Sequence, residues 1–165
     1  MKIAIAGDSV GVTLADIIIS HLHTYAGIHL TNMSPSAENP GEYYADVAER
    51  VASAILAGDF DRGILCCGTG IGMAISANKV PGIRAAQTHD AFSAVRAAKS
   101  NNAHIITLGA RVVGSELAKT IVDAWLAAEF DPQGPSASNV AAIGKLDEKY
   151  KRAVSEKSGA HMPAR

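Results

Sequence analysis

The stretch ILCCGTGIG, residues 64–72, determines how the rest of the chain is interpreted. An apolar run reaches two adjacent cysteines and then breaks into glycines that alternate around one threonine. Because only glycine adopts tight or left-handed backbone conformations without steric cost, the chain is expected to turn sharply there or to approach another group closely. The stretch therefore predicts a buried strand over residues 63–67, a turn, and a helix that follows it.

The same succession of an apolar run and a segment of helical period repeats along the chain. Strands are expected at residues 2–6, 28–30, 63–67, 83–86 and 104–108, and helices at 12–23, 44–58, 73–76, 91–99 and 115–128. Runs that are apolar on both faces, each followed by a helix, are typical of a parallel sheet that is covered on two sides. The sequence predicts a doubly wound α/β domain with five parallel strands.

The composition changes after Phe130. Residues 131–136 form a linker-like bend, and the Lys- and Glu-rich segment beyond it carries Val140, Ile143 and Leu146 at helical spacing. We expect residues 1–130 to form the α/β domain. Residues 131–157 are expected to form an arm that packs on the domain or on a partner subunit, and residues 158–165 a frayed tail.

The overall composition argues against several classes of function. The formal net charge of −1 gives the chain of 165 residues no basic field for nucleic acid and no polybasic face for a membrane. No apolar run is long enough to span a bilayer or to serve as a signal peptide. Two adjacent cysteines make a poor disulfide framework, so reduced thiols in the cytoplasm are expected. No spacing typical of a zinc site occurs, and we expect no metal.

Chemistry is expected where the strands end, because open α/β sheets bind ligands beyond the carboxyl ends of their strands. Cys67 stands there, close to a helix start, where unpaired backbone N–H groups favour a thiolate and can hold an oxyanion. A thiolate beside oxyanion donors suits removal of a proton α to a carbonyl. The alternative for Cys67 is a small buried hydrophobe, and the residue pattern leaves both interpretations open. Cys66 should face the other side of the strand and be buried.

Other candidates at this edge have simpler explanations. Asp8 either binds sugar hydroxyls or caps the next helix. Asp90 is a natural N-cap, and the adjacent His89 has no assigned role. The glycine spacing at 68–72 differs from that of the dinucleotide fingerprint, and no Lys-Ser or Lys-Thr pair follows as in a P-loop. A phospho-receiver domain would need an Asp where Cys67 stands.

Three motifs resemble a known family: CGTGIG at 67–72, SANKVPGIRAA at 76–86 and GARVVG at 109–114. From Met1 to about Phe130 the chain resembles the type B ribose-5-phosphate isomerases, a family that also includes galactose-6-phosphate isomerases. The resemblance implies a flavodoxin-like sheet and aldose–ketose isomerisation of a sugar phosphate through an enediolate, with no metal or other cofactor. It also implies a homodimer or a dimer of dimers, with active sites at the subunit interface.

The resemblance assigns roles by position. Cys67 matches the base that moves a proton between C1 and C2, and Thr69 matches a hydroxyl at the reacting oxygens. Gly68, Gly70 and Gly72 match the turn whose amides hold the enediolate. The other matches are substrate contacts: Asp8, Tyr44 and Asn101 toward sugar hydroxyls, and Arg111 toward phosphate.

The chain also departs from the family pattern. Ser9 stands where the type B ribose isomerases usually have a His, and Ser100 stands at the position of their ring-opening His. Both serines are candidate substrate-binding residues. Two phosphate-binding arginines of the family correspond to Pro135 and Asn139. His104 stands where the family commonly has Asn, and is expected to be a strand-start residue with a hydrogen-bonded imidazole.

The missing ring-opening group points to a particular substrate. Ribose 5-phosphate is mainly a closed ring, so its isomerase needs a general acid–base group to open it. A tetrose 4-phosphate stays acyclic, because its phosphate occupies the oxygen that would close a furanose. Asp8-Ser9, Ser100–Asn102 and the GPSAS segment at 134–138 resemble the D-erythrulose-4-phosphate isomerase branch.

The leading hypothesis is therefore interconversion of D-erythrulose 4-phosphate and D-erythrose 4-phosphate. The first alternative is the same reaction on ribose 5-phosphate. Two others are a catalytically silent partner subunit and a non-catalytic anion-binding or thiol redox module.

Overall fold

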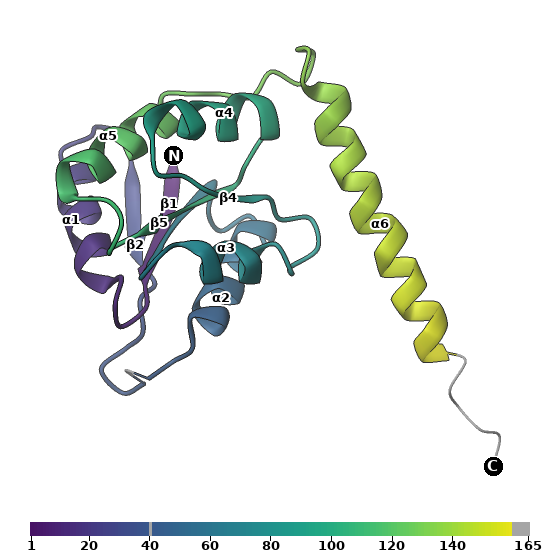
Figure 1. The fold of residues 1–165 in the computed structure, drawn as a ribbon, viewed down its shortest axis with the longest axis horizontal. Coiled ribbons are helices and arrows are strands. Elements are labelled where there is room, and N and C mark those ends of the chain that lie inside the picture. Colours follow the sequence, from purple (N-terminus) through teal and green to yellow (C-terminus); the bar gives the residue numbers. More distant parts are fainter. Residues whose placement is uncertain (40, 160–165) are drawn as a thin grey trace.

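The computed structural model describes residues 1–39 and 41–159 of the chain, in which five strands alternate with helices (Figure 1). The strands are β1 (Lys2–Gly7), β2 (His29–Asn32), β3 (Arg62–Cys67), β4 (Ala85–Gln87) and β5 (Ile105–Gly109). The helices are α1 (Val12–Leu22), α2 (Tyr44–Leu56), α3 (Ile71–Ala77), α4 (Ala91–Asn101), α5 (Ser115–Leu126) and α6 (Ala137–Gly159). Pro40, in the expected loop after β2, and residues 160–165 of the expected tail lie outside the described residues.

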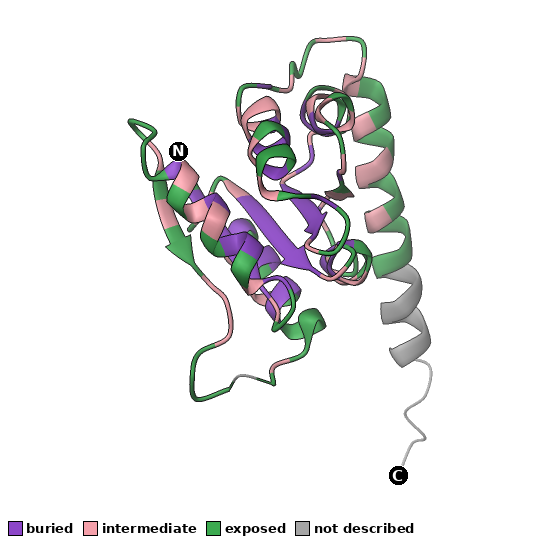
Figure 2. Ribbon diagram, turned by 60° about the vertical axis from the view of Figure 1, so that its left-hand side comes forward, coloured by how far each residue is buried: buried purple, intermediate pink, exposed green. Residues whose placement is uncertain are grey.

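All the strand pairs are parallel, in the order β2-β1-β3-β5-β4, which confirms the doubly wound α/β fold class. The last two strands are exchanged relative to the flavodoxin order 2-1-3-4-5. Burial follows this order: β5 is buried at every residue, whereas the edge strands β2 and β4 retain exposed or half-buried positions (Figure 2).

Two separate hydrophobic cores lie on the two faces of the sheet. Helices α1, α4 and α5 cover one face and helices α2 and α3 cover the other. Because side chains alternate along a strand, Cys66 belongs to the first core and Cys67 to the second. The expectation that the two thiols face opposite sides is confirmed.

Some element boundaries differ from those expected. β4 begins at Ala85 instead of Ile83, because the Ile83 N–H donates to the Val80 carbonyl in a turn that precedes the strand. Helix α5 ends at Leu126, two residues before the expected end. Neither difference moves a candidate site residue.

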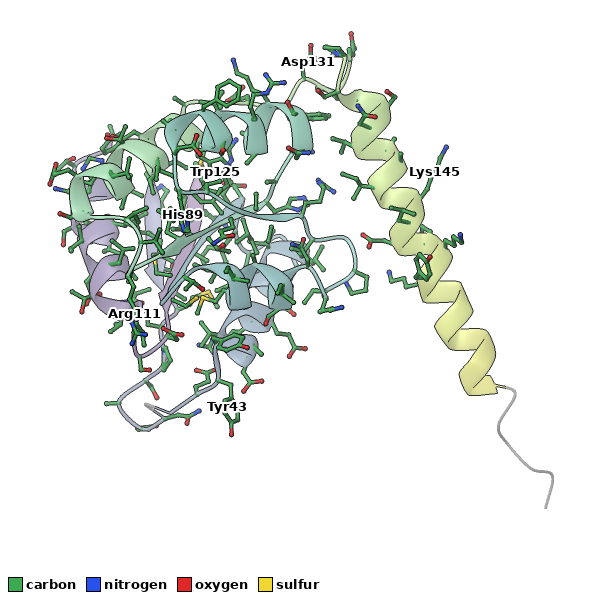
Figure 3. All side chains as sticks on the ribbon, viewed as in Figure 1. Tyr43, His89, Arg111, Trp125, Asp131 and Lys145 are labelled. Atoms are coloured by element: carbon green, nitrogen blue, oxygen red, sulfur yellow. The ribbon has the colours of Figure 1, made fainter. Side chains whose placement is uncertain are left out.

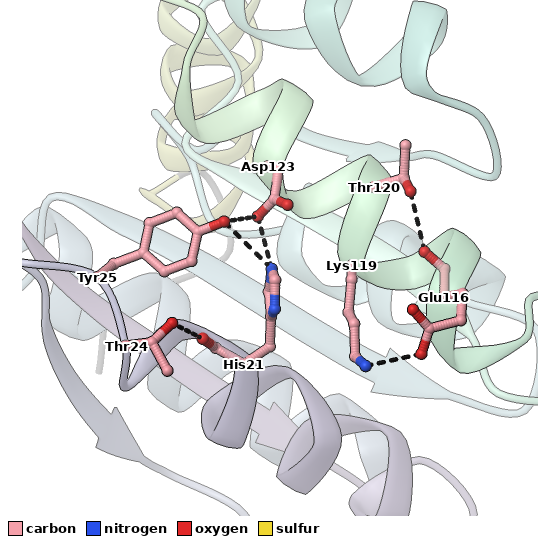
Figure 4. A network of polar contacts seen from close by, with 7 residues as sticks. All are labelled: His21, Thr24, Tyr25, Glu116, Lys119, Thr120 and Asp123. Atoms are coloured by element: carbon pink, nitrogen blue, oxygen red, sulfur yellow. Dashed lines mark hydrogen bonds and ion pairs between the residues drawn. The ribbon is translucent and has the colours of Figure 1, made fainter.

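Helices α1 and α5 are joined at the surface by a small polar cluster (Figure 4). His21 Nε2 and the Tyr25 hydroxyl lie 2.8 and 2.9 Å from the same carboxylate oxygen of Asp123. The hydrogen bond to Asp123 raises the pKa of Tyr25. The cluster fixes the two helices against each other on the face that covers Cys66.

Helix α6 runs along the β4 side of the domain and extends past it (Figure 1). It contacts α4, and the Gly82 N–H donates to Asp147 Oδ2 at 2.9 Å. The arm therefore packs on its own domain at this point. Its helix continues through Gly159, past the expected end of the arm. Within the described residues, none of the helices has the length and apolarity needed to cross a membrane.

Candidate active site

Cys67 ends β3 at the centre of the sheet's carboxyl edge. It pairs with Gly109 of β5, while the preceding residue pairs with Gly7 of β1, so the ends of three strands meet there. The Cys67 side chain is 5% exposed, and its Sγ accepts the Gly70 N–H at 3.1 Å. The sulfur therefore contacts a backbone N–H group directly before the start of α3.

Cys66 has the opposite environment. It is fully buried, and this burial, with smaller contributions from the charges of Cys67 and Asp8, raises the pKa of its thiol. The thiolate form of Cys66 is therefore disfavoured at neutral pH. Among the described residues, Cys67 differs from Cys66 in two respects: the residue keeps a small exposed surface, and its sulfur accepts a backbone N–H.

The glycine turn after Cys67 confirms both the sharp turn and the close approach expected from the sequence. Gly70 has φ of 79°, a left-handed conformation that favours glycine. A Cβ on Gly109 would lie 2.8 Å from the backbone of Thr69, so the turn rests directly on the end of β5. A larger residue at either position would push the turn away from Cys67.

Thr69 belongs to the turn, and Tyr44 packs against it. Thr69 is exposed, and its hydroxyl accepts the Ile71 N–H at 3.3 Å. The Tyr44 ring packs against Gly72, where a Cβ would lie 2.8 Å from Cε2 of the ring. The predicted substrate contact at Tyr44 therefore lies beside the turn.

Asp8 stabilises the loop that leads into α1, but it does not cap the helix, because the N-cap of α1 is Gly11 and has no side-chain cap. Its Oδ1 accepts the N–H groups of Val10 and Gly11, at 2.9 and 2.8 Å. Asp8 and Ser9 also line a cavity of about 230 Å³, together with Gly7, Val12 and residues 35–37. One carboxylate oxygen is thus used by the fold, and the residue faces a cavity at the same edge of the sheet as Cys67.

Arg111 lies next to the turn. Its backbone N–H donates to the Gly68 carbonyl at 3.0 Å, and its side-chain Cδ would lie 3.8 Å from a Cβ on Gly68. The candidates Asp8, Ser9, Tyr44, Gly68, Thr69, Gly70, Gly72 and Arg111 all lie near this edge with Cys67.

Ser100 and Asn101 do not join this group within one chain. They end α4, which runs back from the carboxyl end of β4 toward the start of that strand. Arg84, the residue before β4, donates Nε–H to the carbonyls of Asn101 and Asn102 at 3.1 and 2.9 Å. Both candidates therefore lie at the amino edge of the sheet, opposite Cys67. The Ser100 hydroxyl is buried without a hydrogen-bond partner in the described part of the chain.

The histidines near these elements have structural contacts. His89 Nε2 accepts the Gly109 N–H at 3.2 Å. Asp90 caps α4 by accepting the Ser93 N–H at 2.7 Å, and hydrogen bonding from the side chain and the backbone of Ser93 lowers the pKa of Asp90. His104 contacts Arg84 through both ring nitrogens, as expected of a hydrogen-bonded imidazole. Burial, reinforced by the charge of Arg84, lowers the pKa of His104 to about 4.

Figure 3 shows Arg111 and Lys145 on opposite sides of the molecule, Lys145 on α6. Among residues 1–39 and 41–151, no group of three or more His, Cys, Asp or Glu side chains is arranged to hold a metal ion.

Two residues that the sequence did not single out hold the turn in place. Gln87 Nε2 donates to the Thr69 carbonyl at 2.7 Å, and the buried Thr107 hydroxyl donates to the Gly70 carbonyl at 2.8 Å. In the sequence, Thr107 is recognisable only as a polar residue inside the apolar run of β5, and Gln87 as a polar residue at the end of β4. These positions do not predict which backbone carbonyl either side chain contacts.

The chain is similar to known proteins over most of its length. The family model described as Ribose/Galactose Isomerase matches residues 3–143. The chain is 53% identical over 92% of its length to a D-erythrulose-4-phosphate isomerase of Pectobacterium atrosepticum, covering 98% of that protein. It is 48% identical over 90% of its length to Ribose-5-P isomerase B of Listeria innocua, covering 99% of that protein.

A solved structure supports the same relationship. Ribose-5-Phosphate Isomerase B of Clostridium thermocellum superposes with a TM-score of 0.84 at 43% identity, covering 91% of this chain and 99% of that one. The expected class of enzyme, an isomerase, is confirmed. The chain belongs to the Ribose/Galactose Isomerase family, as the three motifs in its sequence indicated.

Proposed function

We propose that the chain is an aldose–ketose isomerase of a short phosphorylated sugar and that Cys67 is its catalytic base. The observation that carries the proposal is the hydrogen bond from the Gly70 N–H to the Cys67 sulfur, at the edge of the sheet where α/β proteins bind ligands. A base must be within reach of the proton it takes and must be unprotonated at the working pH. The Gly70 N–H contacts the sulfur, and the small exposed surface of Cys67 offers access.

The reaction proceeds in two proton transfers at carbon. The Cys67 thiolate takes a proton from C1 of the ketose, which leaves a thiol and an enediolate whose negative charge is spread over the two oxygens. The thiol then returns the proton to C2, while a proton passes from the C1 oxygen to the C2 oxygen, giving the aldose. Backbone N–H groups of residues 68–72 stabilise the enediolate, and the Thr69 hydroxyl assists at the oxygens.

The proposed substrate is D-erythrulose 4-phosphate, which is converted into D-erythrose 4-phosphate. Two observations support it: Ser100 stands where a ring-opening His is usual, and a relative bearing the name D-erythrulose-4-phosphate isomerase shares about half of its residues with this chain. An acyclic tetrose phosphate needs no ring-opening acid or base. Ribose 5-phosphate is the second candidate, favoured by the similarity to the Listeria enzyme.

We further propose that the active site is completed by a second copy of the chain in a homodimer or dimer of dimers. Asn101 and Ser100 lie at the edge opposite Cys67, so they can contact the same substrate only if a partner supplies them. Val10, Ile71 and Val112 expose apolar surface around the Cys67 edge, which a partner would cover. The free thiols fit a cytoplasmic location.

Steady-state assays of the purified protein on both sugar phosphates test the substrate. We expect kcat/KM to be higher for D-erythrulose 4-phosphate, and a much higher value for ribose 5-phosphate would overturn the assignment. Thiol titration with and without substrate tests the non-catalytic alternative. Protection of Cys67 by a sugar phosphate supports the isomerase, and indifference supports an anion-binding or redox module.

Subunit mixing tests the shared site. A Cys67→Ala chain and an Asn101→Ala chain each lack one part of every site. Random reassociation should restore about a quarter of the wild-type activity, because half of the dimers are mixed and each mixed dimer has one intact site. Activity that stays at the level of the separate variants after exchange would contradict a shared site.

A further inference from the structure

The peptide unit between Thr69 and Gly70 has hydrogen-bond partners at both ends. Its N–H, on Gly70, donates to Cys67 Sγ at 3.1 Å, and its carbonyl, on Thr69, accepts from Gln87 Nε2 at 2.7 Å. Because a peptide is planar, the direction of the carbonyl determines the direction of the N–H. The Gln87 side chain therefore controls where this N–H points.

The next peptide is held as well. Its carbonyl, on Gly70, accepts from the Thr107 hydroxyl at 2.8 Å, and Thr107 has no exposed surface. Gly70 is left-handed, with φ of 79°, and without a side chain it has the widest backbone freedom of any residue. Gln87 from β4 and Thr107 from β5 thus hold the carbonyls on both sides of the most flexible residue in the turn.

We propose that Gln87 and Thr107 are positioning residues for catalysis, which hold the peptides on both sides of Gly70 so that the Gly70 N–H stays directed at the Cys67 sulfur. Neither side chain needs to touch the substrate. The inference deepens the proposed function and rests on it, because it matters for catalysis only if Cys67 is the base.

Two physical effects follow from this arrangement. A carbonyl that accepts a hydrogen bond polarises its own amide, so the N–H at the other end becomes a stronger donor to the thiolate. A fixed peptide also needs no reorientation when the sulfur changes between thiolate and thiol during the two proton transfers. Loss of either contact should raise the proportion of Cys67 present as thiol at neutral pH.

The test compares matched variants in a Cys66→Ala background. Gln87→Met removes the donor and retains the length of an exposed side chain on an edge strand, so folding should be retained. Thr107→Val removes the hydroxyl, and Thr107→Ser restores it. Thr88→Val is the control, because Thr88 is a 1%-exposed threonine whose hydroxyl has no hydrogen-bond partner in the described residues.

The first measurement is the rate of iodoacetamide alkylation of Cys67 against pH, without substrate. We expect the midpoint of this curve to rise by about half to one pH unit in Gln87→Met and Thr107→Val, as loss of one hydrogen bond implies. Thr107→Ser and Thr88→Val should follow the parent. A midpoint that is unchanged in both Gln87→Met and Thr107→Val overturns the proposal.

The second measurement is steady-state kinetics. We expect kcat to fall about 5- to 10-fold in Gln87→Met and Thr107→Val with little change in KM, because the lost contacts act on the base and leave the substrate contacts in place. A rise in KM with kcat unchanged contradicts the positioning role. The two proposals fail separately: an active Cys67→Ala variant overturns the assignment of the base, whereas the alkylation curves test the positioning even in an inactive protein.

Discussion

The Gly70 amide nitrogen lies 3.1 Å from the Cys67 sulfur, three residues along the same turn. The thiol and the group that favours its ionised form therefore come from one short segment. Strand β3 delivers the sulfur, and glycine allows the backbone to fold over it. Cys66, one residue earlier, is directed into the opposite core and has no exposed surface.

The two thiols should differ in reactivity. We expect iodoacetamide to modify Cys67 in the native protein at neutral pH and to leave Cys66 unmodified until the protein unfolds, because burial raises the pKa of Cys66. Mass spectrometry of peptides after a timed reaction measures both. Equal labelling of the two residues in the folded protein would contradict the difference in environment.

Asp8 should contribute separately to the stability of the protein and to substrate binding. Asp8→Asn retains an oxygen that can accept the Val10 and Gly11 N–H groups, so we expect nearly unchanged stability but a higher KM. Asp8→Ala loses these two hydrogen bonds and should also cost about 1 kcal/mol in the free energy of unfolding. Urea unfolding and steady-state kinetics measure the two effects. An unchanged KM in both variants would contradict a substrate contact at Asp8 and assign it a structural role only.

Gly11 should tolerate no side chain. A Cβ there would lie 1.9 Å from the Cys66 carbonyl oxygen, a backbone atom that cannot move without disturbing β3. We expect Gly11→Ala to lower the free energy of unfolding by about 3 kcal/mol or more.

Gly144→Ala is the matched control for Gly11→Ala. Gly144 is in helix α6 with no neighbouring atom within 4 Å of the added Cβ, so alanine should be neutral or stabilising by up to about 1 kcal/mol. Urea unfolding measures both variants. Similar effects of the two substitutions would contradict the close approach at Gly11.

His104 should make the protein less stable in mild acid. Its pKa is about 4 in the folded chain, below the ordinary value of 6.5, so the unfolded chain binds the proton first as the pH falls. Stability is therefore lost between about pH 6.5 and pH 4, by about 1–2 kcal/mol after allowance for solvent screening, and no further below that range.

The comparison with His104→Asn isolates this effect. We expect the difference in unfolding free energy, wild type minus variant, to decrease as the pH falls through that window, measured by urea unfolding at each pH. A difference that is constant or increases toward pH 4 would show that His104 is not held neutral by its surroundings.

The fold class followed from the sequence because each strand is a short apolar run with a helix behind it. The exchange of β4 and β5 did not, since each apolar run predicts a strand but does not predict which strand pairs with β3. The location of Cys67 at a turn also followed, from the glycines. The contacts of Gln87 and Thr107 with that turn depend on strand order, which local patterns do not encode.

The central claim is that Cys67 takes the proton from carbon, and the most direct measurement is kcat of Cys67→Ala on D-erythrulose 4-phosphate and ribose 5-phosphate, with Cys66→Ala as the control. We predict that Cys67→Ala loses activity by a factor of about 10³ or more on whichever sugar the wild type prefers, while Cys66→Ala stays within a few-fold of the wild type. Activity of Cys67→Ala within a few-fold of the wild type would contradict the account.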